Sequence, residues 1–193
     1  MEPAPRAQST MTDDALPIPV HAILGPSGSG KSTIGAAMAR DAGTMHVELD
    51  RFPYNGYRAA SLHGEWESFT RGGDPAPLAG ECRRRAQQAG KQRVVLTATS
   101  RSIAPPATCA AARQAGLFVH VLFGPRYAFL RAFLERERDT GRGLNESWWL
   151  SNNRTCREFR KAGYAPFRLD VIENGERVGE GEIVRRILAR ETS

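Results

Sequence analysis

Lysine, cysteine and long apolar runs are scarce in this sequence. Only three of its 27 basic residues are lysines, so arginine carries nearly all of the positive charge. The three cysteines lie far apart and lack the spacing of metal ligands, which argues against a zinc site and fits a reducing compartment. No apolar run is long enough to cross a bilayer, and the N-terminus lacks the features of a signal peptide. We therefore expect a cytoplasmic protein without a membrane partner.

The length of the chain indicates one domain. A sequence of 193 residues with a hydrophobic fraction of 40% is long enough for one buried core. Residues 1–16 are rich in Pro, Ala, Ser and Thr, so we expect a disordered tail there and place the domain at 17–193. The net charge of +6 fits either a nucleic-acid surface or a polyphosphate site, and charge alone does not choose between them.

Residues 25–33 form the most informative stretch of the sequence. They match the pattern G-x-x-x-x-G-K-[ST], they follow an apolar run at 18–24, and a helical pattern begins at Lys31. Glycines allow backbone conformations that direct successive N–H groups at one anion, and a helix start adds further N–H groups and a partial positive charge. We call this stretch the phosphate loop and predict that it binds the phosphates of a nucleotide.

The phosphate loop supplies the predicted nucleotide-binding residues. Lys31 is expected to reach the β- and γ-phosphates, and the Ser32 hydroxyl is expected to bind Mg²⁺. ATP and Mg²⁺ are therefore the expected cofactors. The predicted binding residues are Gly25, Ser27, Gly28, Ser29, Gly30, Lys31, Ser32 and Thr33.

Asp50 follows a short apolar segment at about 45–49 and is the second candidate. Ligands of open parallel sheets gather at the carboxyl ends of the strands, so this carboxylate is expected to face the phosphate loop. There it would accept the proton of an attacking hydroxyl or hold a water of the Mg²⁺ shell. The competing interpretation is that Asp50 caps a turn. Glu48 is a weaker candidate for the same tasks.

An acid is missing near Thr97, where many P-loop proteins carry an aspartate for the metal. This absence shifts the expected metal binding toward Ser32 and Asp50.

A charged segment with glycines follows the helix predicted at about 125–139. It carries Arg136, Arg138 and Arg142, the last between two glycines. Such glycines allow a hinge, so we predict a lid at about 136–147 in which Arg138 and Arg142 stabilise the charge of a transferring phosphoryl group. The alternative is that these arginines pair with neighbouring acids on an exposed helix, each pair contributing ~0.3–0.5 kcal/mol.

Aromatic residues between 54 and 71 have two equally weighted interpretations. With the arginines among them they fit a lid over a planar or anionic acceptor, whereas Trp66 and Phe69 also fit ordinary helix packing. In the helix predicted at 146–162, we expect Trp148, Trp149 and Leu150 to lie in the core. The same helix carries arginines at every third position, which would face either the crevice or solvent: Arg154, Arg157 and Arg160.

Short apolar segments alternate with helical patterns along the chain. Strands are predicted at about 18–24, 45–49, 94–100, 117–123 and 168–172. With right-handed crossovers, this alternation predicts an α/β P-loop fold in which a five-stranded parallel sheet is sandwiched between helices. His21, inside the first strand, is predicted to pack in the core rather than bind a ligand.

On these features the chain resembles the P-loop nucleoside and nucleotide kinases, and within them the uridine kinase-like group. The likeness covers most of the predicted domain. It lies in the phosphate loop, in residues 49–52 at the place of the group's acid-x-Phe stretch, and in residues 136–142 at the place of its lid. Residues 169–175 are similar to the group's last strand and adenine-side turn.

The resemblance implies an ATP-dependent kinase for a small molecule, most favourably a nucleoside or nucleotide. It implies that Asp50 is the base toward an acceptor hydroxyl, and that Lys31 acts with Arg138 or Arg142 on the transferring phosphoryl group. Two other functions stay open. One is a nucleotide-binding switch or accessory ATPase whose output is a partner's conformation, and the other is a kinase of nucleic-acid ends.

Overall fold

A parallel sheet forms the centre of the protein. The computed structural model describes residues 17–49, 60–98, 101–141 and 146–192, and in it the strands pair in parallel in the order β2-β3-β1-β4-β5. The strands are β1 (Val20–Leu24), β2 (Thr44–Glu48), β3 (Arg93–Thr97), β4 (Leu117–Phe123) and β5 (Arg168–Asp170). The predicted five-stranded parallel sheet is confirmed, with each strand near its predicted place.

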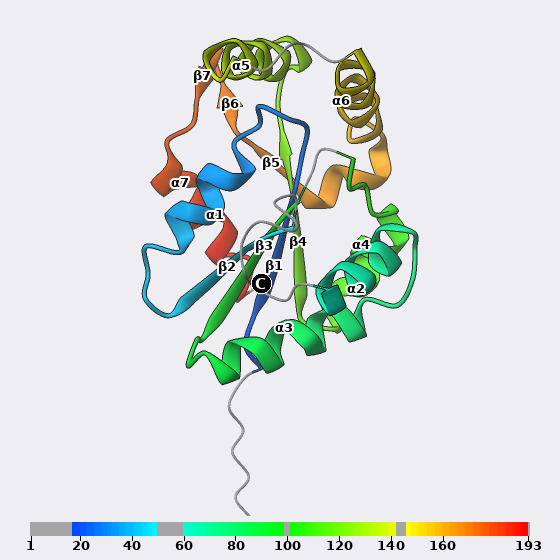
Figure 1. Cartoon of the computed structure of the whole chain (residues 1–193), viewed down its shortest axis with the longest axis vertical. Coiled ribbons are helices and arrows are strands. Elements are labelled where there is room, and N and C mark those ends of the chain that lie inside the picture. Colours follow the sequence, from blue (N-terminus) through cyan, green and yellow to red (C-terminus); the bar gives the residue numbers. More distant parts are fainter. Residues whose placement is uncertain (1–16, 50–59, 99–100, 142–145, 193) are drawn as a thin grey trace, which may run out of the picture.

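Helices connect the strands and cover both faces of the sheet (Figure 1). They are α1 (Lys31–Met38), α2 (Ala60–Thr70), α3 (Ala76–Gln88), α4 (Pro106–Gln114), α5 (Arg126–Asp139), α6 (Glu146–Glu158) and α7 (Glu180–Leu188), with a 3-10 helix η1 (Ala162–Phe167). None of the described helices has the length and apolarity needed to span a membrane.

A small antiparallel hairpin follows β5. It pairs β6 (Ile172–Glu173) with β7 (Glu176–Arg177), and its turn residues Asn174 and Gly175 both have positive φ, as a type I′ turn requires. The prediction that the fifth strand continues to residue 172 was therefore wrong, because this residue pairs with β7 instead.

The two faces of the sheet contact different helices, because successive side chains of a strand point in opposite directions. Val20, Ala22 and Leu24 of β1 pack with α2, α3 and α4, whereas Ile23 packs with α1 and α7. Trp66 of α2 belongs to the first cluster with 4% of its surface exposed. For Trp66, and for the fully buried Phe69 beside it, the packing interpretation is the one that the structure supports.

The helices α5 and α6 lie over the end of the sheet at which β1 leads into the phosphate loop (Figure 1). Helix α6 buries only the side that carries Asn152, Thr155 and Cys156. Trp148 is 40% exposed and Leu150 is 58% exposed, so the prediction that these two residues lie in the core was wrong. An aromatic or leucine residue in a helix does not by itself indicate which end of the helix reaches the core.

Candidate functional site

The phosphate loop joins the end of β1 to the first turn of α1. Gly28 and Gly30 have φ of 82° and 97°, a conformation that residues with a side chain rarely adopt. Gly28 also has no room for a side chain, since a Cβ atom there would lie 3.0 Å from the main-chain nitrogen of Phe133 in α5. The sequence pattern therefore places glycine where both the turn and the close approach of α5 require it.

Lys31 lies across the phosphate loop and is only 8% exposed. Its Nζ donates hydrogen bonds to the carbonyl oxygens of Gly25 (3.0 Å) and Pro26 (3.1 Å). The Ser29 hydroxyl of the same loop is buried and has no hydrogen-bond partner among the described residues. A buried ammonium group and an unsatisfied hydroxyl within one glycine-rich turn fit an anionic ligand such as a nucleotide phosphate. Ser32 and Thr33, in the first turn of α1, are exposed.

Two side chains from distant parts of the chain hold the phosphate loop. The fully buried Asn152 of α6 accepts a hydrogen bond from the Ser27 N–H (2.6 Å) and donates one to the Ser27 carbonyl (3.3 Å). Arg177 of β7 donates a hydrogen bond to the Gly28 carbonyl (2.6 Å). The loop is thus fixed by α6 on one side and by the hairpin on the other.

Positive charge surrounds Cys156, one turn further along α6 than Asn152. Burial raises the pKa of the Cys156 thiol, and the charges of Arg126, Arg160 and Lys31 oppose that shift. Arg126 belongs to α5, Arg160 lies just after α6, and Lys31 belongs to the phosphate loop. Their convergence gives this end of the sheet an electrostatic field that favours anions.

One of the two acidic candidates, Glu48, lies at the carboxyl end of β2. Asp50 is outside the described residues, so its predicted roles as base and metal ligand stay predictions. Glu48 is the last residue of β2, is partly buried and lies opposite Thr97 in the sheet register. The Thr97 hydroxyl is 2.9 Å from Nε2 of His46, so the side chain at the position without an acid forms a structural hydrogen bond.

The arginines of the predicted lid begin on the last turn of α5. Arg136 donates to the Glu137 carboxylate (2.8 Å), and Arg138, whose side chain is 76% exposed, donates to Asp139 (3.1 Å). These ion pairs agree with the alternative interpretation of the two arginines, although Glu137 itself is not exposed: it is 1% exposed, and its Oε2 lacks a partner among the described residues. Arg142 is outside the described residues, and the lid stays a prediction.

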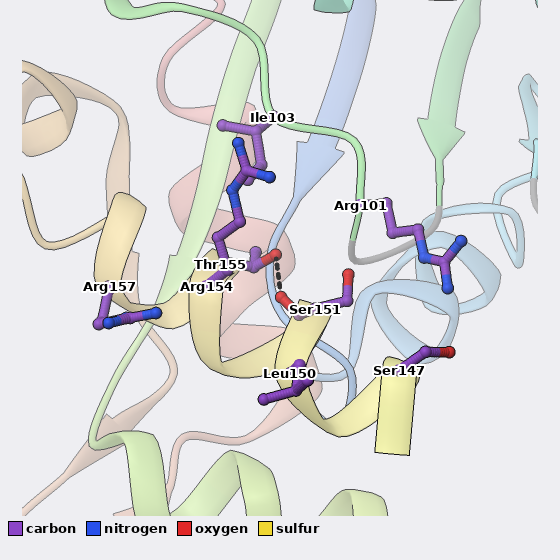
Figure 2. A pocket seen from close by; sticks show the side chains of 8 residues that line it. All are labelled: Arg101, Ile103, Ser147, Leu150, Ser151, Arg154, Thr155 and Arg157. Carbon is purple, nitrogen blue, oxygen red and sulfur yellow. Dashed lines mark hydrogen bonds between the residues drawn. The ribbon is translucent and has the colours of Figure 1, made fainter. Parts of the chain in front are cut away.

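A cavity of about 640 Å³ lies between α6 and the segment that follows β3 (Figure 2). Arg154 extends from α6 toward Ile103, and Arg101 comes from the opposite wall. The lining combines three arginines, three hydroxyl side chains and two apolar residues: Arg101, Arg154, Arg157, Ser147, Ser151, Thr155, Ile103 and Leu150. Neither Arg154 nor Arg157 forms an ion pair with any residue of the described part of the chain. We call this space the arginine cavity.

The arginine cavity adjoins the phosphate loop through α6. Ser151 lines the cavity, and Asn152, the next residue of α6, binds Ser27. The sequence identified the arginines of α6 by their regular spacing but left open whether they face solvent. It gave no signal for Asn152 or Arg177, because their partners lie 125 and 149 residues away along the chain.

No three His, Cys, Asp or Glu side chains among the described residues form a group that could hold a metal ion. The three cysteines are free and buried, so they provide neither a disulfide nor a metal site. Binding of Mg²⁺ through the exposed Ser32 hydroxyl and Asp50 therefore stays a prediction, and the phosphates of a bound nucleotide would have to supply part of the coordination.

No family model matches the chain, and no curated protein matches it in sequence. Solved structures with a similar arrangement include a gluconokinase from Sinorhizobium meliloti 1021 (19% identity, 91% of this chain and 93% of that chain, TM-score 0.47). They also include a shikimate kinase from Bacteroides thetaiotaomicron (19% identity, 91% of this chain and 99% of that chain, TM-score 0.48). A third is a deoxyadenosine kinase from M. mycoides (16% identity, 90% of this chain and 99% of that chain, TM-score 0.43). These identities and TM-scores are low, so we take the fold class from the strand order and the phosphate loop of this chain.

Proposed function

We propose that the protein is an ATP-dependent kinase that transfers the γ-phosphoryl group to a small acceptor carrying an anionic group. The observation that carries this proposal is the arginine cavity beside the phosphate loop, with α6 as their common wall. A switch or accessory ATPase needs a nucleotide site alone. A second, partly open space that is lined by three arginines and lies next to that site fits an enzyme with two substrates.

The phosphate loop would hold the nucleotide. Its glycines bring backbone N–H groups together, and Lys31, now bonded to Gly25 and Pro26, would exchange these carbonyls for the β- and γ-phosphates. When bound, Mg²⁺ supplies positive charge that neutralises the phosphates, and Ser32 with Asp50 would hold it. Arg138 and Arg142 are proposed to approach the γ-phosphoryl group from the lid.

The reaction would be a direct transfer between two oxygens. An acceptor hydroxyl would attack the γ-phosphorus and pass its proton to Asp50, whereas an acceptor phosphate would attack through an oxygen that is already ionised. In both cases the bond from the γ-phosphorus to the β–γ bridging oxygen breaks. ADP leaves with the electron pair of the broken bond. Because positioning and charge stabilisation provide most of the catalysis in this chemistry, no covalent enzyme intermediate is needed.

The arginine cavity narrows the class of acceptor. Its volume of about 640 Å³ is that of a small-molecule site, and guanidinium groups bind carboxylates and phosphates with two parallel hydrogen bonds. Ile103 and Leu150 provide apolar contact for the rest of the molecule. Of the acceptors that the resemblance to uridine kinases implies, a nucleoside monophosphate therefore fits this lining better than an uncharged nucleoside.

A screen with γ-labelled ATP tests the proposal. The acceptors would include nucleosides, nucleoside monophosphates, sugars, sugar acids and aminoglycosides, and we expect labelled product from an anionic member. With that acceptor, Arg154→Ala should raise the acceptor KM at least tenfold and leave the ATP KM within twofold. Arg131→Ala, which removes an exposed arginine paired with Glu135 on α5, is the matched control and should change neither.

The other two functions give different results in the same assay. Hydrolysis of ATP without any phosphorylated acceptor would indicate a switch or accessory ATPase. Labelling of nucleic-acid ends that weakens steeply with salt would indicate an end kinase, whereas a small acceptor releases few counterions. Absence of Mg-ATP binding in calorimetry would overturn all three.

A further inference from the structure

Asn152 bonds both main-chain groups of one residue of the phosphate loop, Ser27. Oδ1 accepts from the Ser27 N–H at 2.6 Å, Nδ2 donates to the Ser27 carbonyl at 3.3 Å, and the side chain is fully buried. Because both main-chain groups of Ser27 are bonded to the same side chain, this residue cannot rotate without breaking the pair. The orientation of the following loop residues therefore depends on α6.

Ser27 lies in the part of the loop where the lysine ammonium group sits. Lys31 Nζ contacts the carbonyls of Gly25 and Pro26, which directly precede Ser27. In this type of loop the lysine reaches the β- and γ-phosphates, whereas the helix start lies toward the inner phosphates. The segment that Asn152 fixes is thus the one next to the terminal phosphate.

We propose that Asn152 is a positioning residue for the terminal phosphate of the nucleotide, acting through Ser27 rather than by contact with the ligand. This inference rests on the proposed function, because it requires a nucleotide in the phosphate loop. It predicts that Asn152 matters more for a triphosphate than for a diphosphate. A carboxamide that only stabilised α6 against the domain would affect both nucleotides equally.

Calorimetry on the full chain tests the inference with two probes, Mg-ADP and the Mg complex of a non-hydrolysable ATP analogue. Asn152→Leu keeps the size of the side chain and removes both hydrogen bonds. We expect the Kd of the triphosphate analogue to rise about tenfold, as when a misoriented loop loses about one hydrogen bond to the terminal phosphate, and the Kd of Mg-ADP to change less than twofold.

Two further variants separate positioning from folding. Asn152→Asp is needed in case the leucine variant disturbs the packing of α6. Aspartate has the size of asparagine and keeps an acceptor for the Ser27 N–H, so this variant should retain that packing. It loses the hydrogen bond to the Ser27 carbonyl and therefore the fixed orientation of Ser27, so it should also weaken the triphosphate more than the diphosphate. Asn153→Ala changes the neighbouring asparagine, which makes no hydrogen bond to the phosphate loop among the described residues, and both Kd values should stay at their wild-type level.

The possible results are distinguishable. An equal loss for both nucleotides, or no loss in Asn152→Leu while the wild type binds normally, overturns the role of Asn152 and leaves the proposed function intact. A wild-type protein that binds neither nucleotide overturns both. Selective loss of the triphosphate in the leucine and aspartate variants, with Asn153→Ala unchanged, supports the inference.

Discussion

The two ends of the central sheet both use charged and polar side chains, but they use them differently. One group of polar side chains lies toward the end of the sheet at which the strands begin. There Nε of Arg93 donates a hydrogen bond to Oε1 of Glu191 (2.7 Å), and Nε2 of His21 lies 2.8 Å from the same oxygen. The fourth member is His120, whose Nε2 forms a hydrogen bond with Nδ1 of His21 (3.0 Å). We call these four residues the base network. At the other end, Lys31 and Arg177 donate to main-chain carbonyls of the phosphate loop.

This difference separates a structural from a functional use of charge. In the base network, acid and base side chains neutralise one another, and the network ties the last residues of the chain to β1 and β3. At the phosphate loop, Lys31 and Arg177 donate to neutral carbonyl groups, and a stronger acceptor such as phosphate can replace these carbonyls. Substitutions in the base network should therefore change the stability of the protein, and substitutions in the phosphate loop should change its activity.

Lys31→Ala should produce the largest effect and the clearest separation. Phosphoryl transfer is expected to fall on the order of a thousandfold, because the variant loses a charge that stabilises the transferring group, while the melting temperature changes little. Lys91→Ala is a matched control, since Nζ of Lys91 also donates to a main-chain carbonyl, that of Ala42, away from the phosphate loop. Wild-type turnover in Lys31→Ala would remove the basis for assigning the site.

Glu191→Ala should act in the opposite way, on stability. Removing this carboxylate leaves Arg93 and His21 without their shared partner, and breaking such a part-buried group is expected to cost about 2 to 3 kcal/mol in free energy of unfolding. Glu180→Ala breaks an exposed pair with Arg40 and should stay within about 0.5 kcal/mol. Urea unfolding measures both, and equal effects would contradict the structural role of the base network.

The base network should also make stability depend on pH. Burial, and then the charges of His21 and Arg190, hold the pKa of His120 well below its ordinary value. Below about pH 6.5 the unfolded chain binds a proton at this residue that the folded protein does not. The free energy of unfolding should therefore fall as pH decreases through 6.5, by at most about 1.4 kcal/mol per pH unit.

His120→Gln tests this dependence because it removes the titrating ring. Burial raises the pKa of Glu191, but hydrogen bonds from His21 and Arg93 outweigh it and lower the pKa to about 2, so this carboxylate stays ionised between pH 7.5 and 5.5. Urea unfolding across that range should show a flatter pH profile in the variant than in the wild type. Parallel profiles would mean that His120 is not the group responsible.

Two glycine variants should give the smallest changes in the free energy of unfolding. They compare a crowded position on α1 with an open position on α3. In Gly35→Ala the new Cβ would lie 2.7 Å from Cε1 of His46, so the ring must move away from Thr97, and we expect a loss of about 1 kcal/mol. In Gly80→Ala on α3 the Cβ meets open space, and the helix should gain about 0.5 to 1 kcal/mol. Stabilisation by both changes would show that His46 is not fixed against α1.

Much of the fold could be predicted from local sequence patterns. The five strands are short apolar runs between helix signals, and the phosphate loop is a contiguous motif whose glycines are required by its own turn. His21 was correctly predicted to pack in the core. The orientation of α6 could not be predicted, because periodicity gives the faces of a helix but not which of its turns contact the domain.

The site was predictable only in its contiguous part. Asn152, Arg177 and Arg101 reach the phosphate loop or the arginine cavity through tertiary contacts that no nearby residue signals. Arg154 was identified by its spacing, but its position in a cavity follows from the packing of α6. The roles of Asp50 and Arg142 stay predictions.

The long sequence separation of these contacts has a consequence for synthesis of the protein. The ribosome completes the motif at 25–33 well before it adds Asn152 and Arg177, which bond to loop residues 125 and 149 positions earlier. At ordinary elongation rates this delay lasts on the order of ten seconds. During that interval a nascent chain has the motif without the two side chains that hold its shape. Tight binding of a nucleoside triphosphate should therefore begin only when the segment through Arg177 has emerged from the ribosome.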